Sequence, residues 1–243
     1  MKNAWKKLIS YLTVDRIILS LGVLSLVFYT ALEVLIRVLQ IAMNPYIRAL
    51  ALVLICIVLY CGGILHLQRT KNPILFRRLF YLFFALYFYL LLTLTLTDIS
   101  LGRDGNFIFN DVNFQDQRTH YVKWFVNLIP FHSIYELYIM GLVNGYVSIH
   151  YVLLNLLGNL CLFMPFSFFM PLFFKKQRKW YWFVLTVLLS ISAVESLQFL
   201  FMIGSCDVDD LILNATGAIA LYLILKTPFI KQFFRKLLQN AFK

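Results

Sequence analysis

The chain has 243 residues, of which 61% are hydrophobic, 17% aromatic and only 14% charged, and its mean hydropathy is +0.79. A soluble domain carries about 25% charged residues, and a larger core does not account for so large an apolar excess. The composition therefore excludes an ordinary soluble domain and predicts an integral membrane protein. The net charge of +11 does not indicate nucleic-acid binding, because the basic residues are spread along the predicted membrane edges.

Six apolar blocks are long enough to cross a bilayer, which takes about 20 mostly apolar residues. They are 17–36, 46–67, 79–97, 150–174, 181–203 and 209–225. None alternates as an outer-membrane strand does. Pro165 and Pro171 are expected to kink the fourth block or to end it early. The predicted fold class is all-α, a polytopic membrane helix bundle with about six transmembrane helices.

The basic residues predict the orientation of this bundle. Most of the 22 lie before the first block, near 69–78, in the 175–179 loop and after the last block. Because basic loops stay in the cytoplasm, both termini are expected there and the segment 98–149 outside. These basic edges would attract anionic headgroups of the lipid bilayer. The tail from Phe229 to Phe242 is expected to form an interfacial helix.

Three parts follow along the chain. Residues 1–78 form a basic N-terminal segment with two transmembrane helices, and residues 79–225 form a four-helix membrane domain. Residues 226–243 are a basic amphipathic cytoplasmic tail. The long outer loop 98–149 is too broken to span the bilayer, so we expect it to cap the bundle as an interfacial or re-entrant piece.

Two carboxylates fall inside the predicted spans, where ionisable side chains are costly and by default mark function or a specific partner. Glu33 lies four residues before Arg37, and an ion pair between them would account for it. Glu195 has no basic residue within a turn, and it shares a helix face with Ser192 and Gln198. Glu195 is therefore the stronger functional candidate.

Three predicted spans bring polar side chains to the outer third of the membrane. Gly158 in the fourth span is expected to allow a close backbone approach. The polar residues are Asn155 and Asn159 in the fourth span, Glu195 and Gln198 in the fifth, and Asp207, Asp209, Asp210 and Asn214 at the sixth. Such a layer either bonds helices together, with Asp207 or Asp209 capping a helix, or forms a site open to the outside.

A site in this layer divides the residues by role. Glu195 and Asp210 are the candidate catalytic carboxylates. No cofactor is predicted, although Asp207, Asp209 and Asp210 could take a divalent cation. Beside the layer, Glu136, His132 and His150 are either acid/base groups of the outer segment or structural. The candidate binding residues are Asn155, Asn159, Gln198, Asp207, Asp209, Asn214 and His132.

Four linked motifs, spread over residues 79–225, resemble the VanZ-like family. They are Asn127-Leu128-Ile129-Pro130-Phe131-His132-Ser133-Ile134, then Asn155-Leu156-Leu157-Gly158-Asn159 with Phe163-Met164-Pro165, then Glu195-Ser196-Leu197-Gln198, and Asp207-Val208-Asp209-Asp210-Leu211-Ile212-Leu213-Asn214 with Gly217. Two positions depart from the family pattern. Ser167 stands where members often carry Gly, and Gly204-Ser205-Cys206 stands where many have an Arg. The second departure weakens any proposal that the site binds phosphate through an arginine.

The resemblance implies a multi-pass protein of the bacterial cytoplasmic membrane and cell envelope. The founding member is associated with lowered susceptibility to teicoplanin, so the resemblance implies a contribution to glycopeptide resistance through an outward-facing polar site. Its partner would be a glycopeptide or a lipid-linked cell-wall precursor. Two alternatives stay open, an intramembrane enzyme acting on a lipid-linked or cell-wall substrate and a small transporter or flippase that uses Glu195.

Overall fold

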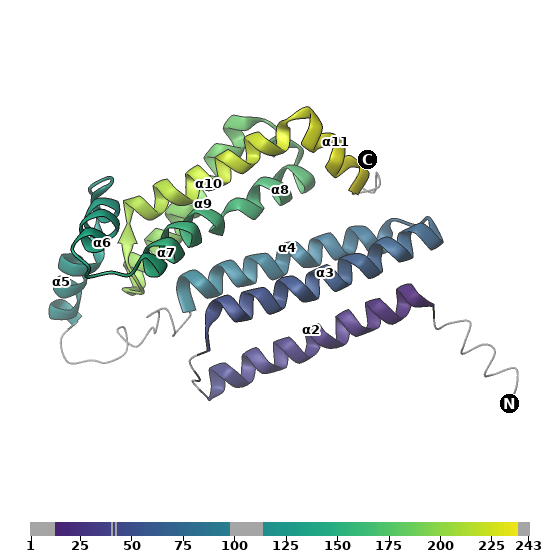
Figure 1. The fold of residues 1–243 in the computed structure, drawn as a ribbon, viewed down its shortest axis with the longest axis horizontal. Coiled ribbons are helices and arrows are strands. Elements are labelled where there is room, and N and C mark those ends of the chain that lie inside the picture. The colour runs from purple at the N-terminus through teal and green to yellow at the C-terminus, as the bar shows by residue number, and fades with distance from the viewer. Residues whose placement is uncertain (1–12, 40, 42, 98–113, 238–243) are drawn as a thin grey trace, which may run out of the picture. The chain divides into compact units, whose positions relative to one another are not determined.

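The computed structural model describes residues 13–39, 41, 43–97 and 114–237. The chain divides into two compact units, with the boundary along the sequence between residues 90 and 91. Each unit is described by itself (Figure 1). Most of the basic N-terminal segment, the opening of the outer loop and the last residues of the tail lie outside the described residues.

The described part of unit 1 consists of three long helices that follow one another with short connections. They are α2 (Val14–Val38), α3 (Pro45–Thr70) and α4 (Ile74–Leu92), whose last residues belong to unit 2. Asn44 caps α3, because its side-chain oxygen accepts the backbone N–H of Tyr46 at 2.9 Å. Helices α2 and α3 pack against each other along their length (Figure 1).

Ion pairs join α2 to α3 at both ends of this helix pair. At one end Glu33 contacts Arg48 at 3.3 Å, and at the other Asp15 contacts His66 at 2.9 Å and Arg69 at 3.0 Å. Both carboxylates are buried, and burial of a charge is tolerated where it has such partners. The ion pair that the structure shows for Glu33 is thus with the neighbouring helix, whereas the side chain of Arg37 lies outside those described.

Unit 2 holds the remaining helices, arranged around α10 (Val208–Lys226). Helix α10 packs against α7 (Ile149–Leu162), α8 (Met164–Phe173) and α9 (Trp180–Phe201). The other elements are η1 (Thr93–Thr97), α5 (Phe114–Phe125), β1 (Val126–Asn127), η4 (Ile134–Met140), α6 (Gly141–Val143), η5 (Lys175–Arg178), β2 (Cys206–Asp207) and α11 (Pro228–Leu237). The site described below lies where α10 begins.

The fourth span is broken, as its prolines predict. Helix α7 ends at Leu162 and α8 begins at Met164, with Pro165 in its first turn. Proline is tolerated there because the first N–H groups of a helix have no partner within it. Pro171 lies inside α8, which continues to Phe173. The kink expected in this span is therefore at Phe163, beside Pro165.

A glycine in α10 allows the backbones of α7 and α10 to meet. A Cβ atom on Gly217 would lie 1.8 Å from the carbonyl oxygen of Leu160, far inside any real contact distance. A Cβ on Gly158 would meet nothing within 4 Å. The prediction that Gly158 provides the close approach is therefore wrong. The glycine that allows the close approach is Gly217, in α10, which lies across the helix contact from α7.

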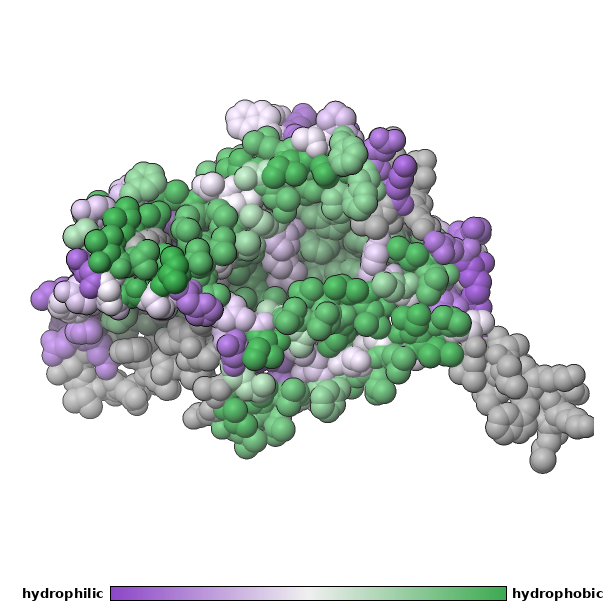
Figure 2. Space-filling model, in the orientation of Figure 1, coloured by the Kyte–Doolittle hydropathy of each residue, from purple (hydrophilic) through white to green (hydrophobic). Residues whose placement is uncertain are grey.

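Within the described residues, six helices of 19 to 26 residues are long and apolar enough to cross a membrane, so the predicted number of spans is confirmed. They begin and end within five residues of the predicted blocks. On the face drawn in Figure 2, hydrophobic residues cover the sides of the helices and hydrophilic ones gather toward their ends. Exposed apolar sides suit contact with lipid tails. The fold is that of a multi-pass α-helical membrane protein.

Candidate functional site

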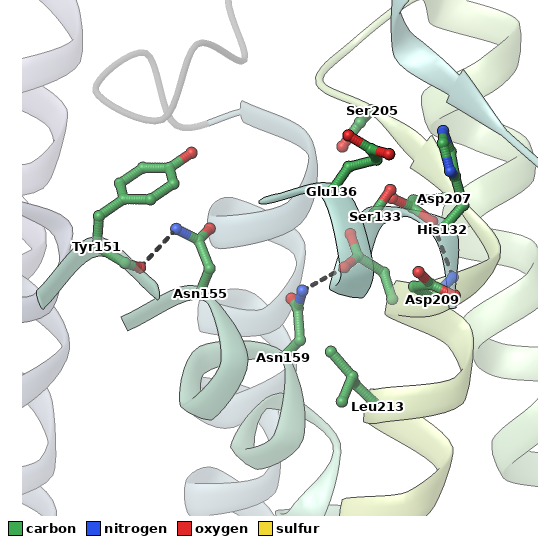
Figure 3. Close-up of a pocket in the computed structure, with 11 residues that line it drawn as sticks. His132, Ser133, Glu136, Tyr151, Asn155, Asn159, Ser205, Asp207, Asp209 and Leu213 are labelled. Carbon is green, nitrogen blue, oxygen red and sulfur yellow. Dashed lines mark hydrogen bonds between the residues drawn. The ribbon is translucent and has the colours of Figure 1, made fainter. Parts of the chain in front are cut away.

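A polar cavity of about 420 Å³ lies in unit 2, at the N-terminal end of α10 (Figure 3). Its walls come from the segment 132–136, helix α7, the loop before α10, and α10 itself. The lining residues are His132, Ser133, Glu136, Tyr151, Asn155, Asn159, Ser205, Asp207, Asp209, Asp210 and Leu213. Six of the nine site residues predicted from sequence are among them.

Two short strands join the walls of the cavity. Strand β1 pairs in parallel with β2, with Asn127 opposite Asp207. The Asn127 side chain donates to Asp207 Oδ1 at 2.8 Å and to Ser133 Oγ at 3.0 Å, and its own oxygen accepts the Ile129 N–H at 3.0 Å. Asn127 therefore connects the first of the four motifs to the last, over 80 positions of sequence.

Asp209 holds the loop that presents His132 and Ser133. Its side chain is almost completely buried, with 1% of the residue exposed. One carboxylate oxygen accepts the Phe131 N–H and the other accepts the Ile134 N–H at 3.0 Å. Hydrogen bonds from backbone N–H groups offset the cost of burying a carboxylate. Because Phe131 has a φ of 63°, this loop also contains a left-handed residue that needs such support.

Asp207 and Asp210 have different positions around the cavity. Asp207 caps α10, since its side chain accepts the Asp209 N–H at 2.8 Å. Asp210 accepts a hydrogen bond from the Asn159 side chain of α7. In Figure 3, Asn159 points toward the acidic residues at the start of α10, whereas Asn155 bonds the carbonyl of Tyr151 in its own helix, at 3.0 Å. Asp210 and Asn159 thus form one wall across two helices.

Glu195 contacts a residue of the lining and is not itself among the lining residues. Its Oε2 accepts the Asp207 N–H at 3.1 Å. Since α9 continues to Phe201, the loop before α10 must fold back past nearly two turns of α9 to reach it. Glu195 therefore holds the backbone of Asp207 in place. Its predicted acid/base role stays a prediction.

Two other predicted site residues also lie outside the lining. Gln198 is buried, and its side chain donates to the Thr95 carbonyl at 3.0 Å. Asn214 is buried one turn below Asp210 and donates to the Asp210 carbonyl at 2.7 Å. Gln198 therefore joins two helical segments, as the packing interpretation of the polar layer predicted, whereas this bond of Asn214 lies within α10.

The cavity has a negative electrostatic character. Four of the lining residues are carboxylic acids, and no Lys or Arg is among the described residues of its walls. Beside it, burial and then the nearby carboxylates of Glu195 and Asp207 raise the pKa of the Cys206 thiol to about 11. A thiol next to negative charge keeps its proton because the thiolate is disfavoured there. An anionic group would meet the same repulsion.

The described residues include no group of three or more His, Cys, Asp and Glu side chains arranged to hold a metal ion. The three aspartates named in the sequence as able to take a divalent cation each accept hydrogen bonds from N–H donors.

Two lining residues and one residue that joins the walls are hard to identify from the sequence. Tyr151 lines the cavity and carries no signal in the sequence beyond its place on α7. Ser133, which also lines it, and Asn127, which joins its walls, are marked in the sequence only as members of a motif. Their roles depend on the β1–β2 pairing, which spacing alone does not predict.

Fold and cavity together define a multi-pass helical membrane protein with a polar site at one end of its bundle. The chain belongs to the VanZ/LLP1 family, which matches residues 79–232 and so includes every residue of the cavity. No curated protein and no solved structure matches the chain. The resemblance noted in the sequence is thereby confirmed.

Proposed function

We propose that this VanZ-family protein resides in the bacterial cytoplasmic membrane and contributes to glycopeptide resistance of the teicoplanin type. The cavity at the start of α10 would be its ligand site, open to the outer face. The observation that carries this proposal is the convergence of three separate motifs on one cavity of about 420 Å³. A polar layer that only bonded helices together would close against itself instead of leaving such a space.

The chemistry of the walls favours a ligand rich in N–H and O–H donors. Carboxylates of Glu136, Asp207 and Asp210 accept hydrogen bonds, and the amide of Asn155 can both donate and accept. Peptide N–H groups, sugar hydroxyls and protonated amines match this lining, and a glycopeptide carries such groups. A lipid-linked precursor would have to keep its phosphates outside, since like charges repel.

Removal of one charge from the cavity tests the proposal. We expect Asp210→Asn to weaken ligand binding by about tenfold or more, because hydrogen bonds to charged groups are the strong ones. The minimal inhibitory concentration of teicoplanin should then fall toward that of cells without the protein. The measurement compares susceptible cells that express each variant at equal membrane levels.

Asp116→Asn is the matched control, because Asp116 is exposed on α5 and lies outside the cavity lining. It makes the same chemical change and should leave resistance intact. Full resistance in cells with Asp210→Asn would contradict the proposal.

A second candidate is an intramembrane enzyme. It is favoured by the presence of His132 and Glu136 on the same cavity as Asp210, because these groups can exchange protons. Purified protein incubated with envelope lipids and cell-wall precursors should then change the mass of one of them, and Glu195→Gln should alter the pH profile of that change. Unchanged masses would eliminate the enzyme and leave the binding site.

A further inference from the structure

The end of unit 2 away from the cavity carries charged side chains of one sign, all of them basic. It comprises the η5 turn between α8 and α9, the end of α10, and helix α11. Positions 174–182 and 222–237 contain no acidic residue. The exposed basic residues there are Lys175, Lys176, Arg178, Lys179, Lys226, Lys231 and Lys236. We call this surface the basic face.

Tyr222 fixes the two halves of the basic face to each other. Its hydroxyl lies 3.1 Å from the carbonyl oxygen of Gln177 and 3.0 Å from that of Arg178, both in η5. Its ring stacks on Phe183 with the centroids 4.0 Å apart. The ammonium of Lys226 lies 4.4 Å from the centre of the same ring. The turn and the end of α10 thus hold their positive charges side by side before any ligand arrives, which lowers the cost of binding.

Helix α11 adds an amphipathic element to the basic face. Its apolar residues recur at 229, 230, 233, 234 and 237, and its polar residues occupy the other side. Phe234 packs on Phe168 of α8, with ring centroids 5.3 Å apart. Phe229 and Phe233 remain 79% and 54% exposed, next to Lys231. A helix docked by one aromatic residue while two others stay uncovered is suited to the headgroup region of a membrane.

Exposed aromatic side chains continue this pattern at the start of α9. Trp180 is 62% exposed and Trp182 is 41% exposed, directly after the η5 turn. Tryptophan gathers at the level of the headgroups, where its ring is half in apolar and half in polar surroundings. Positive charge and interfacial aromatic rings therefore lie on the same end of unit 2.

We propose that the basic face binds the phosphate headgroups of anionic phospholipids in preference to zwitterionic ones. The lysines supply the complementary charge, and Phe229 and Phe233 enter the adjoining acyl region. The proposal does not rest on the proposed function of the cavity, and either can fail without the other.

Tryptophan fluorescence in full-length protein tests this preference. Trp5→Phe and Trp124→Phe leave Trp180 and Trp182 as the reporters next to the basic face. The protein is placed in vesicles of mixed phosphatidylglycerol and phosphatidylcholine, in which one lipid or the other carries bromine as a quencher. We expect brominated phosphatidylglycerol to quench more strongly at equal mole fraction, and the difference to shrink as salt is raised.

The double variant Lys231→Gln, Lys236→Gln removes two charges from α11. Each lysine near an anionic surface is expected to change the relative association constant about fivefold, so the loss of both should lower the preference by about 25-fold. The matched control is Arg118→Gln with Lys123→Gln, which removes two charges from α5 and should keep the preference.

Equal quenching by both brominated lipids in the parent protein would overturn the proposal, and this result needs no lysine variant to fold. A preference that survives the α11 variant unchanged would overturn it as well. So would a preference that the α5 control lowers to the same extent, because net charge and not this face would then be responsible.

Discussion

Replacement of Gly217 by alanine is expected to force α7 and α10 apart. The new Cβ would meet the carbonyl oxygen of Leu160 at 1.8 Å and its carbonyl carbon at 2.8 Å, and neither backbone atom can rotate away. Overpacking of this kind costs about 1–3 kcal/mol, which outweighs the gain of about 1 kcal/mol from alanine in a helix. The midpoint of thermal unfolding in detergent measures the effect.

Gly158→Ala is the matched control, in the helix that faces Gly217. A Cβ there meets nothing within 4 Å, so this variant should unfold at the parent temperature or slightly above it. The two variants should also differ at the cavity. Leu160 follows Asn159, so its displacement should separate Asn159 from Asp210. Equal unfolding midpoints for the two variants would show that the helices do not meet at Gly217.

The second large effect is expected for Asp209→Asn. Both carboxylate oxygens of Asp209 accept backbone N–H groups, from Phe131 and Ile134. An asparagine has only one oxygen, so its NH₂ group would face one of these donors and leave it unsatisfied. A buried unsatisfied donor costs about 1–3 kcal/mol, and the loss of charge weakens the other bond.

This cost should appear locally, in the loop that Asp209 holds. Hydrogen exchange followed by mass spectrometry should show faster exchange than in the parent over residues 126–144. Elsewhere in unit 2 the difference from the parent should be smaller. Asp116→Asn, on the exposed face of α5, is the control for the same substitution. Unaltered exchange at Phe131 and Ile134 would mean that another contact fixes the loop.

The spans were predictable because hydropathy acts over 20 residues and needs no knowledge of partners. The break beside Pro165 was predictable for a similar reason, since the missing N–H of proline acts on its own helix. Which backbone approaches which was not, because Gly158 and Gly217 look alike in sequence. Only the rotation of α7 against α10 decides that a Cβ is excluded at Gly217 and free at Gly158.

The site was predictable in its members more than in their roles. Spacing placed Asn159 and Asp210 at one level, and the structure joins them. The spacing did not reveal that the loop before α10 folds back along α9. Because of this path, Glu195 accepts the Asp207 N–H and does not line the cavity. The ion pair of Glu33 with Arg48 was missed for the same reason, since a partner on another helix leaves no trace in local spacing.

The polar layer therefore combines both interpretations that its sequence allowed. Gln198 joins α9 to η1, whereas Asn214 bonds a carbonyl of its own helix. Asp207 and Asp209 fix the start of α10 and the loop at Ile134. Asp210, Asn159 and His132 are left to line the space that these bonds keep open. Substitutions of the residues that make these bonds should affect folding. Substitutions of Asp210, Asn159 or His132 should affect the affinity for a ligand.

The most direct test of an outward-facing cavity is the labelling of introduced cysteines in intact cells. The background lacks the four native cysteines, and Asn155→Cys reports on the cavity while Lys176→Cys reports on the basic face. We expect a membrane-impermeant maleimide to modify Asn155→Cys in intact cells, more slowly when teicoplanin is present, and to modify Lys176→Cys only after permeabilisation. The reverse pattern would place the cavity on the cytoplasmic side and contradict the account.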